Sequence, residues 1–247
     1  MVNKKTFKPK LLESKVTKRI DVTEDLLIIW ITKPDEYSFK PGQYCTIGID
    51  GLERAYSIVS APHENELELF VELVPPPDGM LTPEIWKLKE GDTVSIRPRA
   101  KGIFTFRPKY NKHLFVATVT GVVPYISILR DYLYHNQTGH DFYLLFGASY
   151  QTEFTYKDEI DEISKNHSEF IKFVPTVSRP KEAANSSWEG ETGRVNEIVG
   201  KYIENFELDA ENTLIYACGH PGMIEDVKEK WVPNGFKVDE ERFWKED

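Results

Sequence analysis

The stretch HLFVATVTGVVPYISILRDYL, residues 113–133, decides how the second half of this chain folds. It begins with a mostly apolar run over residues 113–119, which is typical of a buried β-strand. Thr120 and Gly121 follow, and the apolar side chains after them recur at steps of three and four residues, which predicts a helix. A buried strand that leads directly into a helix is the opening of a β-α-β unit.

Three further apolar runs, over residues 141–146, 170–177 and 213–217, are separated by segments with helical spacing. Such alternation predicts a parallel sheet with crossover helices, whose ligands bind beyond the carboxyl ends of the strands. Short motifs stand at three of these ends, namely Thr120-Gly121, Ser178-Arg179 and Cys218-Gly219. We therefore expect a ligand site at this edge of the sheet.

Residues 11–100 have a different pattern, with short β-rich runs separated by proline and glycine. The runs over residues 26–32, 44–49, 67–74 and 93–97 predict a small antiparallel barrel. A short helix over residues 82–88 follows the Asp78-Gly79 turn, and its amino end would offer free N–H groups to a phosphate. The polar, proline-containing segment 106–111 is the expected hinge between two domains.

The motif Arg54-Ala55-Tyr56-Ser57 in the first half has the side chains that a flavin nucleotide needs. A guanidinium suits a diphosphate, a phenol can cover a flat ring system, and a hydroxyl can donate to or accept from a ring nitrogen. Four residues of this kind are common by chance. On the motif alone, an ordinary strand with Tyr56 packed and Arg54 solvated is the alternative.

Seven motifs follow one another along the chain: Pro41-Gly42-Gln43-Tyr44, Arg54-Ala55-Tyr56-Ser57, Gly79-Met80-Leu81-Thr82, Thr120-Gly121 with Pro124, Ser178-Arg179, Cys218-Gly219 with Pro221 and Met223, and Arg242-Phe243-Trp244. In this order they resemble the small bacterial ferredoxin/flavodoxin–NADP(H) reductases of the plant-type ferredoxin reductase superfamily, over nearly the whole chain. The resemblance implies an antiparallel β-barrel domain that binds FAD, residues 1–108. An α/β parallel-sheet domain that binds NADP follows, residues 109–247, and its carboxyl-terminal segment returns to FAD.

The resemblance implies that FAD binds non-covalently at the barrel motif. By position, Arg54 meets the diphosphate, Tyr56 lies against one face of the isoalloxazine and Ser57 approaches its N5. The other implied FAD residues are Ala55, Phe70, Met80, Leu81, Thr82, Thr120, Phe243 and Trp244. For Thr82, a role as helix N-cap is an alternative that is compatible with flavin binding.

The resemblance also implies an NADP(H) site at the carboxyl ends of the parallel strands. Its residues by position are Gly121, Ser178, Arg179, Arg194, Cys218, Gly219 and Met223. Cys218 would face the nicotinamide C4, and Ser57, Cys218 and Phe243 would form the reacting centre. Hydride transfer needs only two rings held at reactive distance, without a tuned acid or base. Without the resemblance, a free buried cysteine is usually a small apolar side chain.

The chain departs from the family pattern at three positions. Val119 and Val123 stand where the family usually has small residues, which let the backbone approach a pyrophosphate. Ser149 stands where many small bacterial members have a third arginine. Arg179 and Arg194 still favour the 2′-phosphate of NADP over NAD, although an isolated exposed arginine often has no specific role.

The carboxyl terminus places two aromatic residues next to each other at positions 243 and 244. By position in the resembling family, Phe243 covers the isoalloxazine face opposite Tyr56, and Trp244 stacks on the adenine. Phe243 would then occupy the space that nicotinamide needs and would have to move for hydride transfer. The alternative is that both rings close the sheet of the second domain.

The composition is that of a soluble protein large enough for two cores, with 247 residues, 40% of them hydrophobic and 29% charged. No apolar run approaches the roughly 18 residues needed to span a bilayer, and residues 1–10 lack the apolar segment of a signal peptide. We expect a cytoplasmic protein that does not act at a membrane. Cys45 and Cys218 are too few for a disulfide framework or an iron–sulfur cluster, so electrons would pass to a separate carrier.

The charge distribution bears on that carrier. A net charge of −9 and a pI of 5.3 argue against nucleic-acid binding and would repel an acidic ferredoxin or flavodoxin at long range. From Arg97 to Lys112, however, the chain carries basic residues and no acidic ones. An acidic carrier could dock on this segment, and a solvated basic face is the alternative.

The resemblance therefore implies a ferredoxin/flavodoxin–NADP(+) reductase, an FAD-dependent oxidoreductase that transfers electrons between NADP(H) and ferredoxin or flavodoxin. One alternative is an NAD(P)H-dependent flavin reductase or the reductase component of an oxygenase. A second is a non-catalytic FAD-binding regulatory subunit, which Val119 and Val123 favour. The sequence does not specify the physiological carrier, the direction of electron flow or the oligomeric state.

Overall fold

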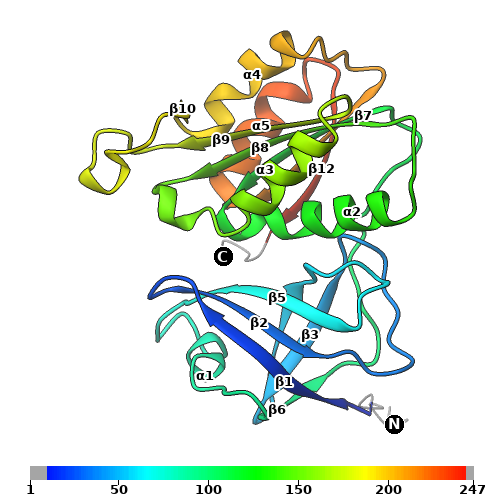
Figure 1. Cartoon of the computed structure of the whole chain (residues 1–247), viewed down its shortest axis with the longest axis vertical. Helices are drawn as coiled ribbons and strands as arrows, with labels where there is room; N and C mark the ends of the chain where they lie inside the picture. The colour runs from blue at the N-terminus through cyan, green and yellow to red at the C-terminus, as the bar shows by residue number, and fades with distance from the viewer. Residues whose placement is uncertain (1–9, 243–247) are drawn as a thin grey trace, which may run out of the picture. The chain divides into compact units, whose positions relative to one another are not determined.

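The computed structural model describes residues 10–242 and divides into two units, one that ends at Ile103 and one that begins at Phe104 (Figure 1). Residues 104–108, which the sequence assigns to the first domain, pack within the second unit. The Phe104 ring lies 5.5 Å from the Tyr216 ring, and the backbone N–H of Arg107 donates to the Tyr216 hydroxyl at 3.0 Å. These contacts favour a boundary before Phe104.

The first unit is built on a six-stranded antiparallel sheet that curls into a nearly closed barrel. The order of its strands is β4-β3-β6-β1-β2-β5, and the two outermost strands, β4 and β5, contact each other. The antiparallel barrel expected from the sequence is confirmed. Its strands are β1 (Leu12–Asp21), β2 (Leu26–Thr32), β3 (Tyr44–Ile49), β4 (Leu52–Ser57), β5 (Glu66–Glu72) and β6 (Thr93–Ile96).

The barrel core follows from the alternation of side chains along its strands. In β2, Leu27, Ile29 and Ile31 are buried in the core because every second side chain of a strand points to the same face. Helix α1 (Thr82–Ile85) adds Ile85 to this core. The helix is one turn long and ends before the expected residue 88, because the backbone continues with tighter bonds, such as that from the Leu88 N–H to the Ile85 carbonyl.

The second unit has a six-stranded sheet in which all adjacent strands are parallel, as the sequence predicts. The strands are β7 (Lys112–Thr118), β8 (Asp141–Ala148), β9 (Ile171–Val177), β10 (Glu191–Thr192), β11 (Thr213–Gly219) and β12 (Lys237–Arg242). The α-helices are α2 (Val123–Tyr134), α3 (Lys157–Asn166), α4 (Val195–Asn205) and α5 (Pro221–Trp231), and the 3-10 turns are η1 (Val119–Val122), η2 (Gln151–Glu153) and η3 (Ala183–Asn185). Among the described residues, no helix has the length and apolar character needed to cross a membrane.

The two faces of the sheet carry different layers, as strand β7 shows. Leu114 and Val116 share a core with Val199 of α4 and Val227 of α5. The intervening Phe115 points to the other face and stacks on Tyr125 of α2, with 4.4 Å between the ring centroids. Alternation within one buried strand therefore holds helices on both faces of the sheet.

The order of the strands, β10-β9-β8-β7-β11-β12, contains a reversal at its centre. From β7 the chain builds outward through β8 and β9, then returns to add β11 on the other side of β7. Such a reversal leaves a crevice at the carboxyl ends of the two central strands, where ligands of open α/β sheets bind. The motifs that follow β7 and β11 meet at this crevice.

Candidate functional site

The motif Arg54-Ala55-Tyr56-Ser57 forms the last four of the six residues of strand β4 in the barrel. The Arg54 guanidinium is exposed and donates to the carbonyl of neighbouring Glu53 at 2.8 Å. Tyr56 is half-buried, and burial raises the pKa of its phenol, which stays protonated at neutral pH. The motif therefore combines an exposed cation with a flat, partly covered ring.

Ser57, at the end of β4, carries an unsatisfied hydroxyl. Its side chain is buried, and its Oγ has no hydrogen-bond partner among the described residues. Leaving a buried hydroxyl unsatisfied costs about 1–3 kcal/mol. A ligand with a ring nitrogen or carbonyl would supply the missing partner, so this position fits a flavin ring.

Thr82, the first residue of α1, is tied to the segment that follows strand β5. The Thr82 hydroxyl donates to the Val74 carbonyl at 2.8 Å and accepts from the Val74 N–H at 3.0 Å. The cap position is occupied by Leu81, so the alternative in which Thr82 is the helix N-cap is wrong. A Cβ on Gly79 would lie 1.7 Å from the Val74 carbonyl oxygen, so only glycine fits this close approach.

The other residues expected at the flavin differ in exposure. Met80 is 53% exposed, whereas Leu81 belongs to the barrel core. Phe70 is buried in β5, opposite Ile28 of β2. Phe243 and Trp244 lie outside the described residues.

At the central crevice of the second unit, the loops after β7 and β11 touch through their backbones. A Cβ on Gly121 would lie 2.1 Å from the Cys218 carbonyl oxygen, and Gly219 has a φ of +126°. The His220 N–H donates to the Thr118 hydroxyl at 2.8 Å, which holds the two loops together. Both glycines are thus required by geometry, as expected where backbone must approach a nucleotide.

Val119 and Val123, the two departures from the family pattern, have different consequences. Val123 is buried at the start of α2 and has an ordinary helical φ of −51°. Val119 has a φ of +41°, in the left-handed region that β-branched residues rarely adopt. The glycine-like backbone is therefore retained at position 119 even though the residue is valine.

Cys218 is fully buried at the end of β11, and burial raises the pKa of its thiol well above the usual value. It is therefore a neutral, apolar group rather than a nucleophile. Glu241 of β12 lies opposite Cys218 in the parallel register. Burial raises the pKa of the Glu241 carboxyl to about 7, and its Oε2 has no hydrogen-bond partner among the described residues.

Glu241 is a candidate functional residue that the sequence analysis missed. It lies in the strand KVDEER, where acidic residues are consecutive, and only the register identifies the one that lies opposite Cys218. A strand of this composition would otherwise be read as solvent-exposed.

The two arginines expected at the 2′-phosphate follow adjacent strands. Thr192 of β10 pairs with Val177 of β9, and Arg194 and Arg179 each lie two residues further along the chain. Both side chains are exposed. Ser178, directly before Arg179, and Ser149, directly after β8, are half-buried, and Met223 is buried in the first turn of α5.

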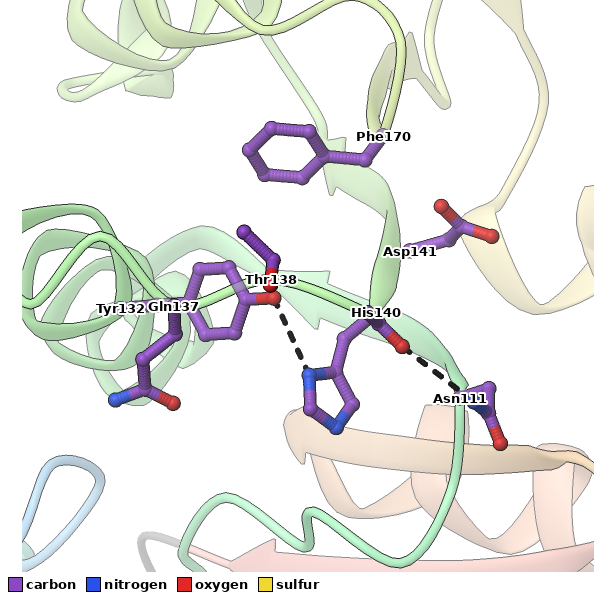
Figure 2. A pocket seen from close by; sticks show the side chains of 8 residues that line it. Asn111, Tyr132, Gln137, Thr138, His140, Asp141 and Phe170 are labelled. Carbon is purple, nitrogen blue, oxygen red and sulfur yellow. Dashed lines mark hydrogen bonds between the residues drawn. The ribbon is translucent and has the colours of Figure 1, made fainter.

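A separate cavity of about 330 Å³ lies at the opposite edge of this sheet, where the strands begin (Figure 2). Asn111, Asp141 and Phe170 stand at the amino ends of β7, β8 and β9. The Asn111 amide donates to the Gly139 carbonyl at 3.4 Å. The remaining lining residues are Tyr132, Gln137, Thr138 and His140, and the Tyr132 hydroxyl lies 3.2 Å from His140 Nδ1. No expected site residue lines this cavity.

A barrel with a flavin-like motif, followed by a parallel sheet with a dinucleotide crevice, defines a class of oxidoreductases. Residues 115–229 match the family model described as "Oxidoreductase NAD-binding domain". The flavodoxin/ferredoxin–NADP reductase of Escherichia coli is 31% identical over 234 residues, which cover 87% of each chain. The ferredoxin–NADP reductase of Pseudomonas aeruginosa is 30% identical over 218 residues, 81% of each chain.

A solved structure agrees with these relatives. The ferredoxin NADP+ reductase of Neisseria gonorrhoeae, with bound FAD and NADP, has a TM-score of 0.82 and 25% identity, and the match covers 96% of this chain and 100% of that one. The chain belongs to the flavodoxin/ferredoxin–NADP reductase family. No group of residues within 10–242 has the composition and geometry of a metal site.

Proposed function

We propose that this protein transfers electrons between NADP(H) and ferredoxin or flavodoxin by means of a bound FAD. The observation that carries the proposal is the buried Ser57 hydroxyl of the motif Arg54-Ala55-Tyr56-Ser57, which has no hydrogen-bond partner within residues 10–242. Family membership supplies the reaction class, and the flavin supplies the hydride and electron chemistry when it is bound. The chain's own residues bind the two cofactors, orient their rings and shield them from water.

The barrel residues divide this task by chemistry. Arg54 presents an exposed guanidinium to the diphosphate, and the Tyr56 ring covers the flavin on one side. Ser57 donates to or accepts from a ring nitrogen and so satisfies its own buried hydroxyl. Gly79 lets the backbone before α1 turn closely enough to present Met80, Leu81 and Thr82 to the phosphates.

The second unit binds the coenzyme at its central crevice. Gly121 and Gly219 allow backbone to approach the dinucleotide, and Arg179 and Arg194 bind the 2′-phosphate. Cys218 lies at the end of β11 that borders this crevice, and its neutral, fully buried thiol places no charge next to the nicotinamide. Glu241 holds a proton beside it up to about pH 7.

We place the docking site for an acidic carrier on the basic residues between Arg97 and Lys112. These residues differ in whether they already form an ion pair within the chain. Arg97 pairs with Glu53 at 2.9 Å, Arg107 with Asp239 at 3.0 Å, and Lys112 with Asp209 at 3.8 Å. Within residues 10–242, no ion pair involves the remaining three, Arg99, Lys101 and Lys109. Arg99 and Lys101 of the first unit, and separately Lys109 of the second, are therefore the most available for an acidic partner.

Two variants test FAD binding and carrier docking separately. Arg54→Ala should weaken FAD retention by about tenfold or more, since it removes a charged partner of the diphosphate. Arg99→Ala should leave FAD in place and lower kcat/KM for ferredoxin or flavodoxin at low salt. Colourless protein that takes up no added FAD would refute the proposal.

A flavin reductase is the second candidate, because Ser149 adds no positive charge near Arg179. Anaerobic titration with NADPH and with NADH, followed by turnover with a protein carrier or with free flavin, separates the two functions. Equal use of both coenzymes with turnover on free flavin alone would favour the flavin reductase. Reduction by neither coenzyme would favour a regulatory subunit.

A further inference from the structure

The loops that follow β8 and β9 hold the exposed side chain of Arg179 in a small hydrogen-bonded network. Arg179 Nη1 donates to the Tyr150 hydroxyl at 2.7 Å, and the guanidinium lies 5.3 Å from the centre of the Tyr150 ring. The Tyr150 hydroxyl in turn donates to Glu182 Oε2 at 2.6 Å. The other oxygen of Glu182 lies 3.6 Å from Arg179 Nη1. Arg179 is therefore already paired with an anion of the chain itself.

The backbone fixes this arrangement. The Glu182 N–H donates to the Arg179 carbonyl at 3.1 Å, a turn that brings residue 182 back beside residue 179. Asn185 is buried, and its amide donates to the carbonyls of Ser149 at 2.9 Å and Arg179 at 3.0 Å, which ties the two loops together. Glu182 is thus positioned by the fold and does not meet Arg179 by chance.

A second carboxylate stands close to this network. Glu153 Oε2 accepts the backbone N–H groups of Ser149 and Tyr150, at 2.8 and 3.1 Å, so its position is also fixed. Ser149 adds no charge to balance the two carboxylates. The two carboxylates therefore make the local charge around Arg179 less positive than Arg179 and Arg194 alone would make it.

We propose that Glu182 is a specificity-determining residue that competes with the adenosine 2′-phosphate for Arg179 and so narrows the preference for NADP(H) over NAD(H). The inference rests on the proposed function, since it needs a dinucleotide at the carboxyl ends of these strands. A 2′-phosphate must displace Glu182 from Arg179 and then lies near its negative charge. The 2′-hydroxyl of NAD carries no charge and can donate to a carboxylate, so it meets no such penalty.

The size of the effect follows from exposure. The Arg179 and Glu182 side chains are 52% and 51% exposed, and exposed ion pairs are weak. We therefore expect Glu182→Gln to tighten NADP+ binding by about two- to fivefold at low ionic strength and to change NAD+ binding by less than about twofold. Because exposed charges are screened, the gain should shrink at about 0.5 M salt.

The experiment measures Kd for NADP+ and NAD+ by calorimetry on the FAD-loaded full chain. Glu189→Gln is the matched control, because Glu189 is an exposed glutamate of the same loop whose removal changes the net charge equally. Glu182→Gln is repeated in an Arg179→Ala background, where the gain should disappear if Glu182 acts through Arg179.

Four results would overturn the inference: no gain for NADP+, an equal gain for both coenzymes, an equal gain from Glu189→Gln, or a gain that survives Arg179→Ala. If both coenzymes bind and Glu182→Gln leaves their ratio unchanged, only this inference fails. If neither coenzyme binds to FAD-loaded protein, the proposed function fails with it.

Discussion

Val119 offers the sharpest test of how the crevice is built, because a valine there occupies a backbone conformation suited to glycine. Its φ is +41°, and a residue with a Cβ pays about 1–2 kcal/mol in the left-handed region. Val119→Gly removes this strain. Against that gain stand about 0.5–1 kcal/mol for the greater freedom of glycine in the unfolded chain and about 0.5–1 kcal/mol for the lost burial of a half-buried side chain. The free energy of unfolding should therefore change by less than about 1 kcal/mol.

A comparison with alanine isolates the strain. Val119→Ala loses the same methyl groups but keeps the Cβ, so the glycine variant should be more stable than the alanine variant by about 1 kcal/mol. At an ordinary position the order is reversed, and alanine is better by about 0.5–1 kcal/mol. Val174 of β9 is the matched control, because it is also half-buried but is not among the described residues with positive φ.

Urea-induced unfolding of the four variants measures these differences. Stability that ranks alanine above glycine at both positions would show that Val119 carries no backbone strain, and the reasoning would fail. The affinity of Val119→Gly for NADP+ is a second measurement. Removal of the side chain opens the approach to the pyrophosphate, so binding should become tighter.

Three further predictions concern buried groups of the second unit. Burial beside His140 lowers the pKa of His113 to about 3, so its neutral form is favoured above the unfolded pKa of 6.5 and stability falls as pH drops toward 3. Between pH 7 and 5 the free energy of unfolding should fall by about 2 kcal/mol. In urea unfolding of His113→Phe, the free energy of unfolding should depend less on pH in this range. Glu241 acts in the opposite sense, because its folded pKa of about 7 exceeds the usual 4.5. The free energy of unfolding should therefore fall by about 2–3 kcal/mol as pH rises from 5 to 8. Unfolding of Glu241→Gln at these two pH values should lack that fall. Gly121→Ala places a Cβ against the Cys218 carbonyl oxygen. It should lower the free energy of unfolding, measured by thermal unfolding, by about 1–3 kcal/mol and weaken NADP+ binding. An unchanged melting temperature and affinity would contradict the close contact.

Much of the fold could be predicted from the sequence because its signals are local. The apolar run at residues 113–119 and the helical spacing after Gly121 correspond to β7 and α2, and the runs at 26–32 and 44–49 correspond to β2 and β3 residue for residue. Periodicity within one segment fixes whether it becomes a strand or a helix. The same local reading placed Ser178-Arg179 and Cys218-Gly219 at carboxyl ends of strands.

The site itself depends on pairs of residues that are far apart in the sequence. Only the order of the strands sets Gly121 against the Cys218 carbonyl, and only the β11–β12 register sets Glu241 opposite Cys218. A strand with five charged residues in six gives no sign of which one becomes buried, because burial is decided by the neighbouring strand.

The sequence by itself thus determined the barrel, the parallel sheet, the order of the motifs and the family, because each rests on segments of a few residues or on their succession. The tertiary structure alone decided that Thr82 bonds to Val74 in place of capping a helix, that the Ser57 hydroxyl lacks a partner among the described residues, and that Glu182 faces Arg179. These outcomes depend on where the chain returns in space. Pairing, burial and electrostatic neighbours are therefore properties of the folded chain and cannot be read from any one stretch of it.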